Sequence, residues 1–588
     1  MSRWFRKSND PRRYPASRMF SIAPVLVFLV LSLFPHTSQG KNIPLKNQLA
    51  DSSSPYLRDA ATSLVHWQLW GEQAFRLAKE LDRPVLLDIG AIWCHWCHVM
   101  DEKTYGNPEV AKFINENFIP IKVDRDARPD IDERFQLIVS TLSKHGGWPL
   151  TAFLTPSGFV FFGGGTFLPE ARFGRPGFKT LLPRIVEIYQ KDKEKLTANA
   201  KEIYKAIKSN IAGSLQNSPL SQDLVDLIQE DIVNRSDPIY GGIRGTRSQF
   251  PRAPVLILAM ELYAKNGRSD LRNHVETTLN AMAKGGIRDQ LGGGFHRYTT
   301  DHLWIVPHFE QMDYVQAQLL RTYALAYQLT GKPLYREVIE DITRYVNRTL
   351  LDPEEGGFYA HKDADMKPGD DGGYFTWTVE EVKKSLSPMQ AEVMLRYFDI
   401  GVKGEMREDP KKNVLWVAKL PDEIAKELGI SEEKVKGLIR VGKSRLLDVR
   451  NKRKNPFVDK TRYAGRSALM VTGYLEAYKA LGDEKLKQTA LKSLAFIWKN
   501  LYRPSEGIYH AFMENKAHPP YLLSDQVLVA QALLNAFEVT GEIQYVNRAQ
   551  VLMDLAIQRL WDDELGGFFD KISQQGEISA LNLPMKIY

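Results

Sequence analysis

The residues best suited to catalysis are the only two cysteines of the 588-residue chain, Cys94 and Cys97. They stand in the segment Trp93-Cys94-His95-Trp96-Cys97-His98, so two residues separate them and a histidine follows each one. A thiolate is a strong nucleophile, and a second thiol one helical turn further on can attack a mixed disulfide. The spacing therefore predicts thiol–disulfide exchange, with Cys94 as the nucleophile and Cys97 as the resolving thiol.

The elements that must position these thiols are a strand and a helix. The apolar run 85–90 follows Pro84 and predicts a buried strand, residues 99–118 have spacing compatible with a helix, and residues 118–124 predict a second strand. The two cysteines thus lie where a strand turns into a helix. The amino terminus of a helix stabilises a thiolate, so we expect a lowered pKa for Cys94.

Three further residues fit the same active site. Asp88 lies six residues before Cys94, where thioredoxins carry a buried acid that handles the proton of the second cysteine. Trp93 directly precedes the nucleophile, also as in thioredoxins. Pro149 opens a third apolar strand and resembles the thioredoxin cis-proline, which packs opposite the disulfide and shapes substrate docking. The predicted catalytic residues are Cys94, Cys97, Asp88, Trp93 and Pro149.

Other chemistries share parts of this pattern. Cys94, Cys97 and His98 also match the C-x-x-C-H attachment motif of c-type haem, which occurs in exported proteins. The nearby Asp88 and Trp93 argue against haem. A zinc site needs a fourth ligand, and the chain has no second cysteine pair, so no metal site is predicted. No cofactor is predicted beyond a redox-active disulfide, and a purely structural disulfide is the alternative.

Several separated motifs in the first 150 residues follow one order along the chain. They are Asn47-Gln48-Leu49, Ser54-Pro55-Tyr56-Leu57, His66-Trp67, Cys94–Met100, Lys122-Val123-Asp124-Arg125, Arg128-Pro129-Asp130 and Gly146–Pro149. Together they closely resemble the thioredoxin-domain family that includes spermatogenesis-associated protein 20. The resemblance implies a multidomain chain: an α/β thioredoxin-like domain, then an all-α toroid similar to N-acylglucosamine 2-epimerases and six-hairpin glycosidases.

The second half of the chain carries an internal repeat. An aromatic residue stands four positions before a glycine, and Leu or Tyr four positions after it, at Gly267, Gly331, Gly482 and Gly541. Each copy predicts a helix, a glycine C-cap and a second helix. The gap of 151 residues between the second and third glycine indicates a copy that has diverged or been interrupted. Paired glycines at 241–242, 293–294, 356–357, 372–373 and 566–567 predict tight loops between helix pairs.

A second candidate site lies in this helical half. Histidines and carboxylates beside aromatic rings can transfer protons on a sugar held by ring stacking, and two acids are the minimum for glycosidic cleavage. The candidates are His296, His308, Glu310, Asp363 and Asp365. The alternative interpretation is that these residues only fix the conformation of the loops.

The chain departs from the family pattern in two places. Val458-Asp459-Lys460 leads into Tyr463-Ala464-Gly465, where the family usually has paired aspartates, a lysine and then a Trp-Asn-Gly element. The chain also stops at Tyr588, about 20 residues after Phe568, whereas family members run further. We therefore expect an incomplete C-terminal closure of the toroid, and a sugar site that depends on the missing residues would be inactive.

The first 40 residues have the order of an export signal. Residues 1–18 are basic, residues 19–34 are uncharged and apolar, and small residues stand at 38 and 40. An apolar run of 16 residues is short for a stable membrane span of about 20. A cleaved signal peptide is therefore favoured over a membrane anchor. The predicted localisation is exported, either periplasmic or secreted, or membrane-anchored if the signal is not cleaved.

Composition places the rest of the chain among ordinary globular proteins. With 43% hydrophobic and 25% charged residues, collagen-like and wholly disordered classes are excluded. The net charge is +7, and it falls to +2 without the first 40 residues, so nucleic acid is not an expected partner. The predicted domains are a signal peptide or anchor at 1–40, a thioredoxin-like domain at 41–190, a helical linker at 191–220 and an α/α toroid at 221–588.

The preferred function is an exported thiol–disulfide oxidoreductase whose helical domain positions its partner. The expected partners are a disulfide-containing protein or a small thiol, with a carbohydrate as a further candidate and membrane contact only through the N-terminal segment. The alternatives are a carbohydrate-active epimerase or hydrolase that uses the toroid, and a non-enzymatic binding module with a structural disulfide.

Overall fold

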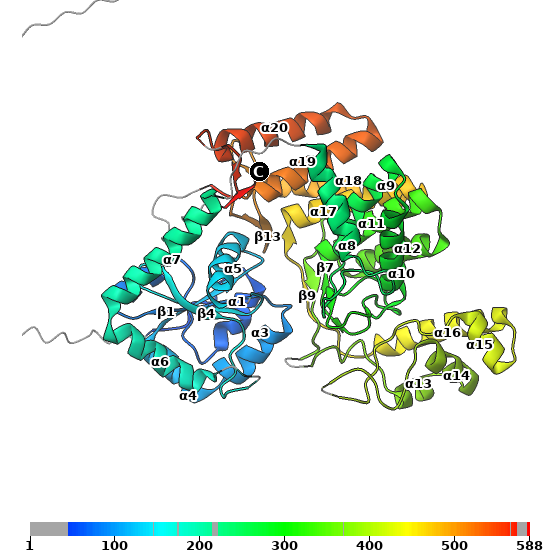
Figure 1. The fold of residues 1–588 in the computed structure, drawn as a ribbon, viewed down its shortest axis with the longest axis horizontal. Coiled ribbons are helices and arrows are strands. Elements are labelled where there is room, and N and C mark those ends of the chain that lie inside the picture. The colour runs from blue at the N-terminus through cyan, green and yellow to red at the C-terminus, as the bar shows by residue number, and fades with distance from the viewer. Residues whose placement is uncertain are drawn as a thin grey trace, which may run out of the picture. The chain divides into compact units, whose positions relative to one another are not determined.

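The computed structural model describes residues 45–144, 146–172, 174, 176–213, 221–367, 370–407, 409–564, 566–572 and 585–587. Pro44–Tyr588 form one compact unit, and Figure 1 shows its elements in chain order. The predicted export segment at 1–40 lies outside the described residues. Within the described ranges, no helix is both long and apolar enough to cross a membrane.

The amino-terminal part is built on a four-stranded sheet. Its strands are β1 (Val85–Gly90), β2 (Ile119–Asp124), β3 (Leu150–Leu154) and β4 (Val160–Gly164), in the order β2-β1-β3-β4. β1 is parallel to β2 and antiparallel to β3, and β3 is antiparallel to β4. The three predicted strands are confirmed at their predicted positions.

Helices cover both faces of this sheet, because the side chains of β1 alternate between two apolar clusters. Leu86 joins a cluster with residues of α4 and α6, whereas Leu87 and Ile89 join one with residues of α2, α5 and α7. The helices are α1 (Pro55–Asp59), α2 (Glu72–Glu80), α3 (His95–Met100), α4 (Pro108–Asn117), α5 (Pro129–Ser143), α6 (Phe178–Lys191) and α7 (Lys193–Gly213). α7, which begins the predicted linker, places Ile207 in the core of the sheet.

The helix predicted over residues 99–118 is wrong in its bounds. The structure has α3, a π-helical segment at Asp101–Tyr105 and then α4. The break follows from local chemistry: the side chain of Asn107 caps the backbone N–H groups of Glu109 and Val110, and Pro108 takes the first helical position.

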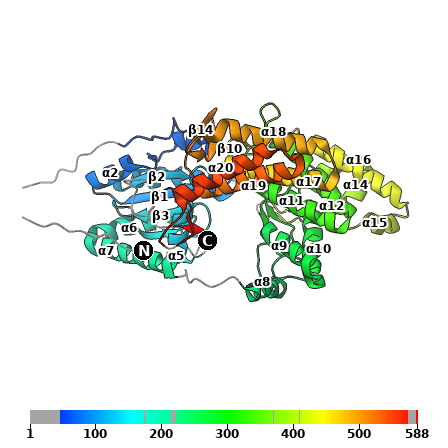
Figure 2. The same cartoon turned by 90° about the horizontal axis from the view of Figure 1, so that it is seen from above.

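Among the described residues, the carboxy-terminal part contains α8 (Gln222–Arg235) and four helical hairpins, which Figure 2 shows from above. The hairpins are α9 (Ala253–Asn266) with α10 (Ser269–Lys284), α11 (Asp313–Thr330) with α12 (Pro333–Thr349), α17 (Ala464–Leu481) with α18 (Glu484–Leu501), and α19 (Leu523–Thr540) with α20 (Ile543–Leu560). The first helices of the hairpins contact one another in the order α9, α11, α17, α19, and each second helix packs on its own first helix. The first helix of every hairpin ends on its predicted glycine, in the left-handed conformation. The fold class, a thioredoxin-like α/β domain followed by an α/α toroid, is thus confirmed.

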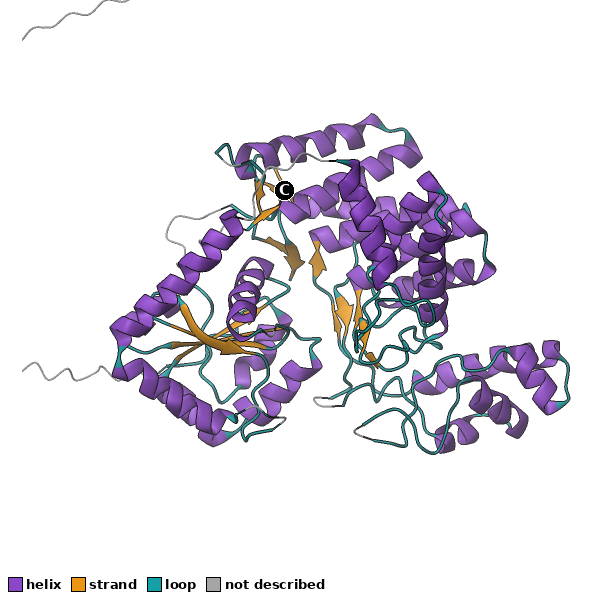
Figure 3. Cartoon of the chain, viewed as in Figure 1, coloured by secondary structure: helices purple, strands orange, loops and turns teal. Residues whose placement is uncertain are grey.

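The long gap in the repeat is an interruption. Between the second and third hairpins lie α13 (Val379–Ser385), α14 (Pro388–Tyr397), α15 (Pro421–Leu428) and α16 (Glu432–Arg450), which share an apolar cluster of their own. Figure 3 shows these helices as a separate group beside the hairpins.

Four of the five glycine pairs belong to one type of turn. Each follows an aspartate by four and five residues, and the aspartate N–H donates to the carbonyl of the second glycine: Asp237 to Gly242, Asp289 to Gly294, Asp352 to Gly357 and Asp562 to Gly567. All eight glycines have positive φ, which explains their residue type. The two residues that flank each turn pair with each other, as Ser236 does with Ile243 and Arg288 with Phe295. The sequence prediction recognised only the glycines.

The remaining strands are short and pair within the helical part. They are β5 (Tyr298–Thr299), β6 (Pro307–His308), β7 (Gln311–Met312), β8 (His361–Lys362), β9 (Val458–Asp459), β10 (Arg462–Tyr463), β11 (Tyr502–Arg503), β12 (Gly507–Ile508), β13 (Ala511–Met513), β14 (Lys516–His518), β15 (Phe568–Phe569) and β16 (Lys586–Ile587). β5 pairs with β6, and β8 lies between β7 and β9.

Candidate active site

The two cysteines lie between β1 and α3. Cys94 is the N-cap residue of α3, and its carbonyl accepts hydrogen bonds from the N–H groups of Cys97 and His98. Both cysteines are free thiols, with Cys94 5% and Cys97 1% exposed. Burial, together with a hydrogen bond to Cys94, raises the pKa of Cys97 well above its ordinary value. Cys94 therefore stands at the start of the helix, as the sequence predicts, whereas Cys97 keeps its proton.

Asp88 lies behind the cysteines in a buried polar cluster. Its carboxylate accepts hydrogen bonds from Lys122 Nζ at 2.8 Å, Tyr105 Oη at 3.0 Å and Tyr56 Oη at 3.3 Å. Although burial alone would lower the pKa of Lys122, the Asp101 and Asp88 carboxylates raise it, so the lysine stays charged. The ammonium group also lies over the rings of Tyr56, Trp67 and Tyr105. The sequence prediction found Asp88 but did not assign a role to Lys122.

Gly90 joins this cluster to Cys97. A Cβ atom at Gly90 would lie 2.2 Å from Tyr56 Oη and 2.9 Å from Cys97 Sγ. The absence of a side chain at this position therefore lets the thiol and the phenol approach the backbone of β1.

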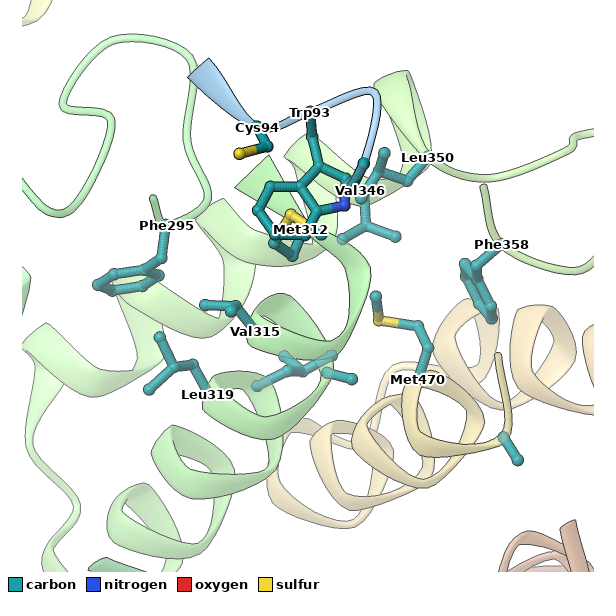
Figure 4. Packing of buried hydrophobic residues seen from close by; sticks show 14 of the residues in the cluster. Trp93, Cys94, Phe295, Met312, Val315, Leu319, Val346, Leu350, Phe358 and Met470 are labelled. Carbon is teal, nitrogen blue, oxygen red and sulfur yellow. The ribbon is translucent and has the colours of Figure 1, made fainter. Parts of the chain in front are cut away.

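Trp93 and Pro149 both lie beside the cysteine motif. The indole N–H of Trp93 donates to Asp126 Oδ2 at 2.7 Å, and its ring lies 5.9 Å from that of Trp148. The Trp148–Pro149 peptide bond is cis, and Pro149 is buried. The guanidinium of Arg297, from the helical part, lies 4.6 Å from the centre of the Trp93 ring. Figure 4 shows Trp93 next to Met312 at the end of the cluster formed by the hairpin helices.

Two carboxylates of the helical part reach the histidines of the cysteine motif. Asp365 Oδ2 lies 3.0 Å from His95 Nδ1 and 3.5 Å from His98 Nδ1. Asp363 Oδ2 lies 3.8 Å from His98 Nε2, which also donates to the carbonyl of Ile92 at 2.6 Å. A segment 270 residues further along the chain thus completes the surroundings of α3.

These contacts set the charges of the cluster. Burial would lower the pKa of both histidines, but the hydrogen bonds to Asp365 and the charges of the surrounding carboxylates together outweigh it. They raise the pKa of His95 to about 9 and that of His98 to about 10. Conversely, burial would raise the pKa of Asp365, but the two histidines lower it to about 2. Burial raises the pKa of Asp363 to about 7. At neutral pH, two imidazolium ions therefore flank Cys94 and share one carboxylate.

His308 and Glu310 lie close to the same cluster. His308 is on β6, and burial lowers its pKa, while the charges of Asp371 and His95 also act on it. Burial raises the pKa of Glu310, which interacts electrostatically with Arg297 and His95. The structure thus brings four candidates of the predicted toroid site, His308, Glu310, Asp363 and Asp365, to the cysteine motif.

His296 has different surroundings. Its Nδ1 is hydrogen-bonded to the carbonyl of Phe309 at 2.9 Å, and its ring packs edge-on against Phe309 and Phe375. Burial lowers its pKa to about 4 in spite of the nearby Asp289, which forms a buried ion pair with Arg450. These contacts support the alternative interpretation for His296, that it holds the loops in place.

Lys122, Arg297 and Asp371 are among the residues of the site that carried no assignment from the sequence. Lys122 stands in one of the family motifs, and Arg297 follows His296 directly. Asp371 immediately precedes the glycine pair at 372–373. These neighbouring motifs were the only available signals, because the partners of all three residues are distant in sequence.

Comparisons with known proteins agree with this architecture. The family model described as "Protein of unknown function, DUF255" (Thioredox_DsbH) matches residues 46–208. Human spermatogenesis-associated protein 20 is 33% identical over 579 residues, which cover 92% of this chain and 73% of the human protein. The uncharacterized protein B0495.5 of Caenorhabditis elegans is 32% identical over 592 residues, which cover 95% of this chain and 79% of that protein.

Solved structures match with lower similarity. A sugar epimerase from a ruminal bacterium is 13% identical, with a TM-score of 0.31, and the match covers 64% of this chain and 93% of the epimerase. A GH76 α-mannanase, BT2949, from Bacteroides thetaiotaomicron is 11% identical, with a TM-score of 0.36, and the match covers 61% of this chain and 82% of the mannanase.

Proposed function

The chain belongs to the family of spermatogenesis-associated protein 20, and we propose that it is a thiol–disulfide oxidoreductase whose active site is shared between the thioredoxin-like domain and the helical toroid. The observation that carries the proposal is the place of Cys94 at the N-cap of α3, with Cys97 one turn further on and Asp88 buried behind it. This arrangement supplies a nucleophile, a resolving thiol and a nearby carboxylate.

In the first step, the thiolate of Cys94 attacks one sulfur of a substrate disulfide. A new S–S bond forms to Cys94, the substrate S–S bond breaks, and the leaving sulfur takes up a proton. The Cys97 thiolate then attacks Cys94 Sγ and releases the second substrate thiol. Two electrons pass to the substrate, and the cysteines end as a disulfide; the same steps in reverse oxidise a dithiol.

The second step requires Cys97 to lose its proton. The carboxylate of Asp88 is the charged group placed to accept it, since Tyr56 contacts Asp88 and lies beside Cys97 at Gly90. Lys122 donates a hydrogen bond to Asp88 at 2.8 Å and holds the carboxylate in place. Asp88 thus acts on the resolving thiol, and Lys122 is a positioning residue.

Access to the site selects the substrate. Cys94 is 5% exposed, whereas Trp96, between the two cysteines, is 38% exposed. A small disulfide or an extended peptide can reach the sulfur beside Trp96, and we propose these two forms of partner. A separate sugar-processing site in the toroid is not proposed, because most of its candidate residues contact or face the cysteine motif.

Trapping tests the reaction directly. In Cys97→Ala the mixed disulfide cannot be resolved, so incubation with glutathione disulfide should leave a stable adduct on Cys94, visible as added mass on the intact protein. A peptide with one internal disulfide should give a second adduct. Cys94→Ala is the matched control and should stay unmodified. Absence of adducts on Cys97→Ala would contradict the proposal.

The reduction potential separates a working pair from a structural clamp. We expect equilibration of the full chain in thiol buffers to give a value between about −120 and −270 mV. A value below about −300 mV would mark a structural disulfide instead. An absorption spectrum of the same sample checks the haem alternative, since bound haem absorbs visible light and a cysteine pair does not.

We also propose export through the segment at 1–40, on the basis of its basic, apolar and small-residue order. N-terminal sequencing of the mature protein should show cleavage close to residue 40. An intact N-terminus in the membrane fraction would instead indicate an anchor, and an intact N-terminus in the cytoplasm would contradict export.

A further inference from the structure

A group of potential metal ligands lies against α3, formed by one histidine of the cysteine motif and two carboxylates of the helical part. One ligand atom from each of His95, Asp365 and Asp371 lies within 4.8 Å of the other two. A tetrahedral Zn²⁺ ion with ligands at about 2.0–2.2 Å places two of its ligand atoms about 3.3–3.6 Å apart. His95 Nδ1 and Asp365 Oδ2 are already 3.0 Å apart, and the remaining separations need to shorten by at most about 1.5 Å for the three side chains to share one ion.

Unpartnered oxygens around this group point to a cation. Asp371 Oδ1 is buried and has no hydrogen-bond partner among the described residues, and the same holds for Glu310 Oε2. Glu310 interacts electrostatically with both His95 and Asp365, so it belongs to the same cluster. A buried carboxylate oxygen without a partner is costly, and coordination to a cation is one of the few ways to remove this cost.

The surroundings also resemble the outer shell of a metal centre. Metal-binding carboxylates are normally held by further hydrogen bonds, which keep them in the orientation for binding. His98 lies within 3.5 Å of Asp365 Oδ2 and is itself held by the carbonyl of Ile92. His308 also interacts electrostatically with Asp371.

We propose that His95, Asp365 and Asp371 bind one divalent transition-metal ion, and that this ion joins the helical toroid to the cysteine motif. One imidazole and two carboxylates suit Zn²⁺, with Glu310 or water completing the coordination. The segment around Asp365 would then be held on α3 when the ion is bound. This proposal does not depend on redox activity, because none of the three ligands is a cysteine.

The test is a titration of the full chain with Zn²⁺ by isothermal calorimetry, after treatment with a chelator and removal of the chelator. Because thiols also bind Zn²⁺, the background is Cys94→Ser/Cys97→Ser. We expect one ion per chain in this background, and at least tenfold weaker binding when Asp371→Asn is added. Asp448→Asn is the control, with the same loss of charge at an exposed position of α16, and should bind within twofold of the background.

A second variant at a proposed ligand distinguishes the loss of a ligand from a folding defect in Asp371→Asn. Asp365→Asn should weaken binding as Asp371→Asn does, and circular dichroism identifies any variant that has lost its structure. No saturable binding in the cysteine-free background would overturn the proposal. Equal binding by Asp371→Asn and Asp448→Asn would overturn it as well. Either result would leave the trapping experiment on Cys94 unaffected, so failure of the metal site and failure of the redox function are distinguishable.

Discussion

Replacing Lys122 with methionine tests the role given to the buried cluster around Asp88. The side chains of Lys122 and Asp88 are both fully buried and 2.8 Å apart. Removing one partner of a buried ion pair leaves an uncompensated charge and costs about 3–5 kcal/mol. Asp101 loses its 2.9 Å contact in the same variant, but it is partly exposed, so solvent takes over much of that interaction. We therefore expect the loss of stability in Lys122→Met to arise mainly from the buried carboxylate of Asp88 that is left without its partner.

Hydrogen exchange of the β1 amides, followed by mass spectrometry, measures this loss within the thioredoxin-like domain. Since about 1.4 kcal/mol is a factor of ten, a loss of about 3–5 kcal/mol predicts exchange that is about 150- to 4,000-fold faster. The double variant Asp88→Asn/Lys122→Met contains no unpaired buried charge. Its loss of stability should therefore be about 2 kcal/mol smaller than the sum of the losses of the two single variants. Lys112→Met, on the exposed face of α4, is the control and should change exchange little. Additive single effects, within about 0.5 kcal/mol, would refute the coupling of Asp88 to Lys122.

Two further variants test other parts of the same domain. Burial raises the pKa of Asp124 to about 7, above its value of about 3.9 in the unfolded chain. The protonated carboxyl therefore stabilises the fold fully below about pH 4, and this stabilisation is lost as the pH rises through 7. Asp124→Asn removes this pH dependence of stability. The free energy of unfolding of the variant in urea, minus that of the native chain, should rise by about 2–3 kcal/mol between pH 5 and pH 7. If this difference stayed constant with pH, the raised pKa of Asp124 would be contradicted. Gly90→Ala should destabilise the domain by about 1–3 kcal/mol, because the new Cβ meets Tyr56 Oη at 2.2 Å. Gly437→Ala, in α16 with no described atom within 4 Å of its Cβ, should instead stabilise by about 0.5–1 kcal/mol; equal effects of the two alanines on the urea midpoint would argue against the close approach at β1.

Local sequence signals predicted the elements well. The glycine C-caps at 267, 331, 482 and 541 all end helices in the left-handed conformation, because only glycine adopts it without steric cost. The strands were found from their apolar runs, and the cysteine motif from its place between a strand and a helix. The helix predicted over 99–118 had wrong bounds, although Asn107-Pro108 is itself a signal for a helix start. The aspartates of the D-x-x-x-G-G turns were not predicted either, although each precedes its glycine pair at the same spacing.

Short segments of the sequence therefore suffice to predict a cysteine at a helix start, a buried acid before it, and helical hairpins with glycine ends. Each depends on interactions within a few residues, which backbone sterics and hydrophobic spacing encode directly. That the residues of the predicted toroid site lie next to the cysteine motif follows only from the packing of distant elements. His95 and Asp365 are 270 residues apart, and their contact depends on how the sheet packs against the hairpins. Likewise, Lys122 pairs with Asp88 because parallel strands β1 and β2 place these two residues side by side in register. Such pairings cannot be predicted from the residue spacing within one segment, because they arise from the packing of whole helices and strands.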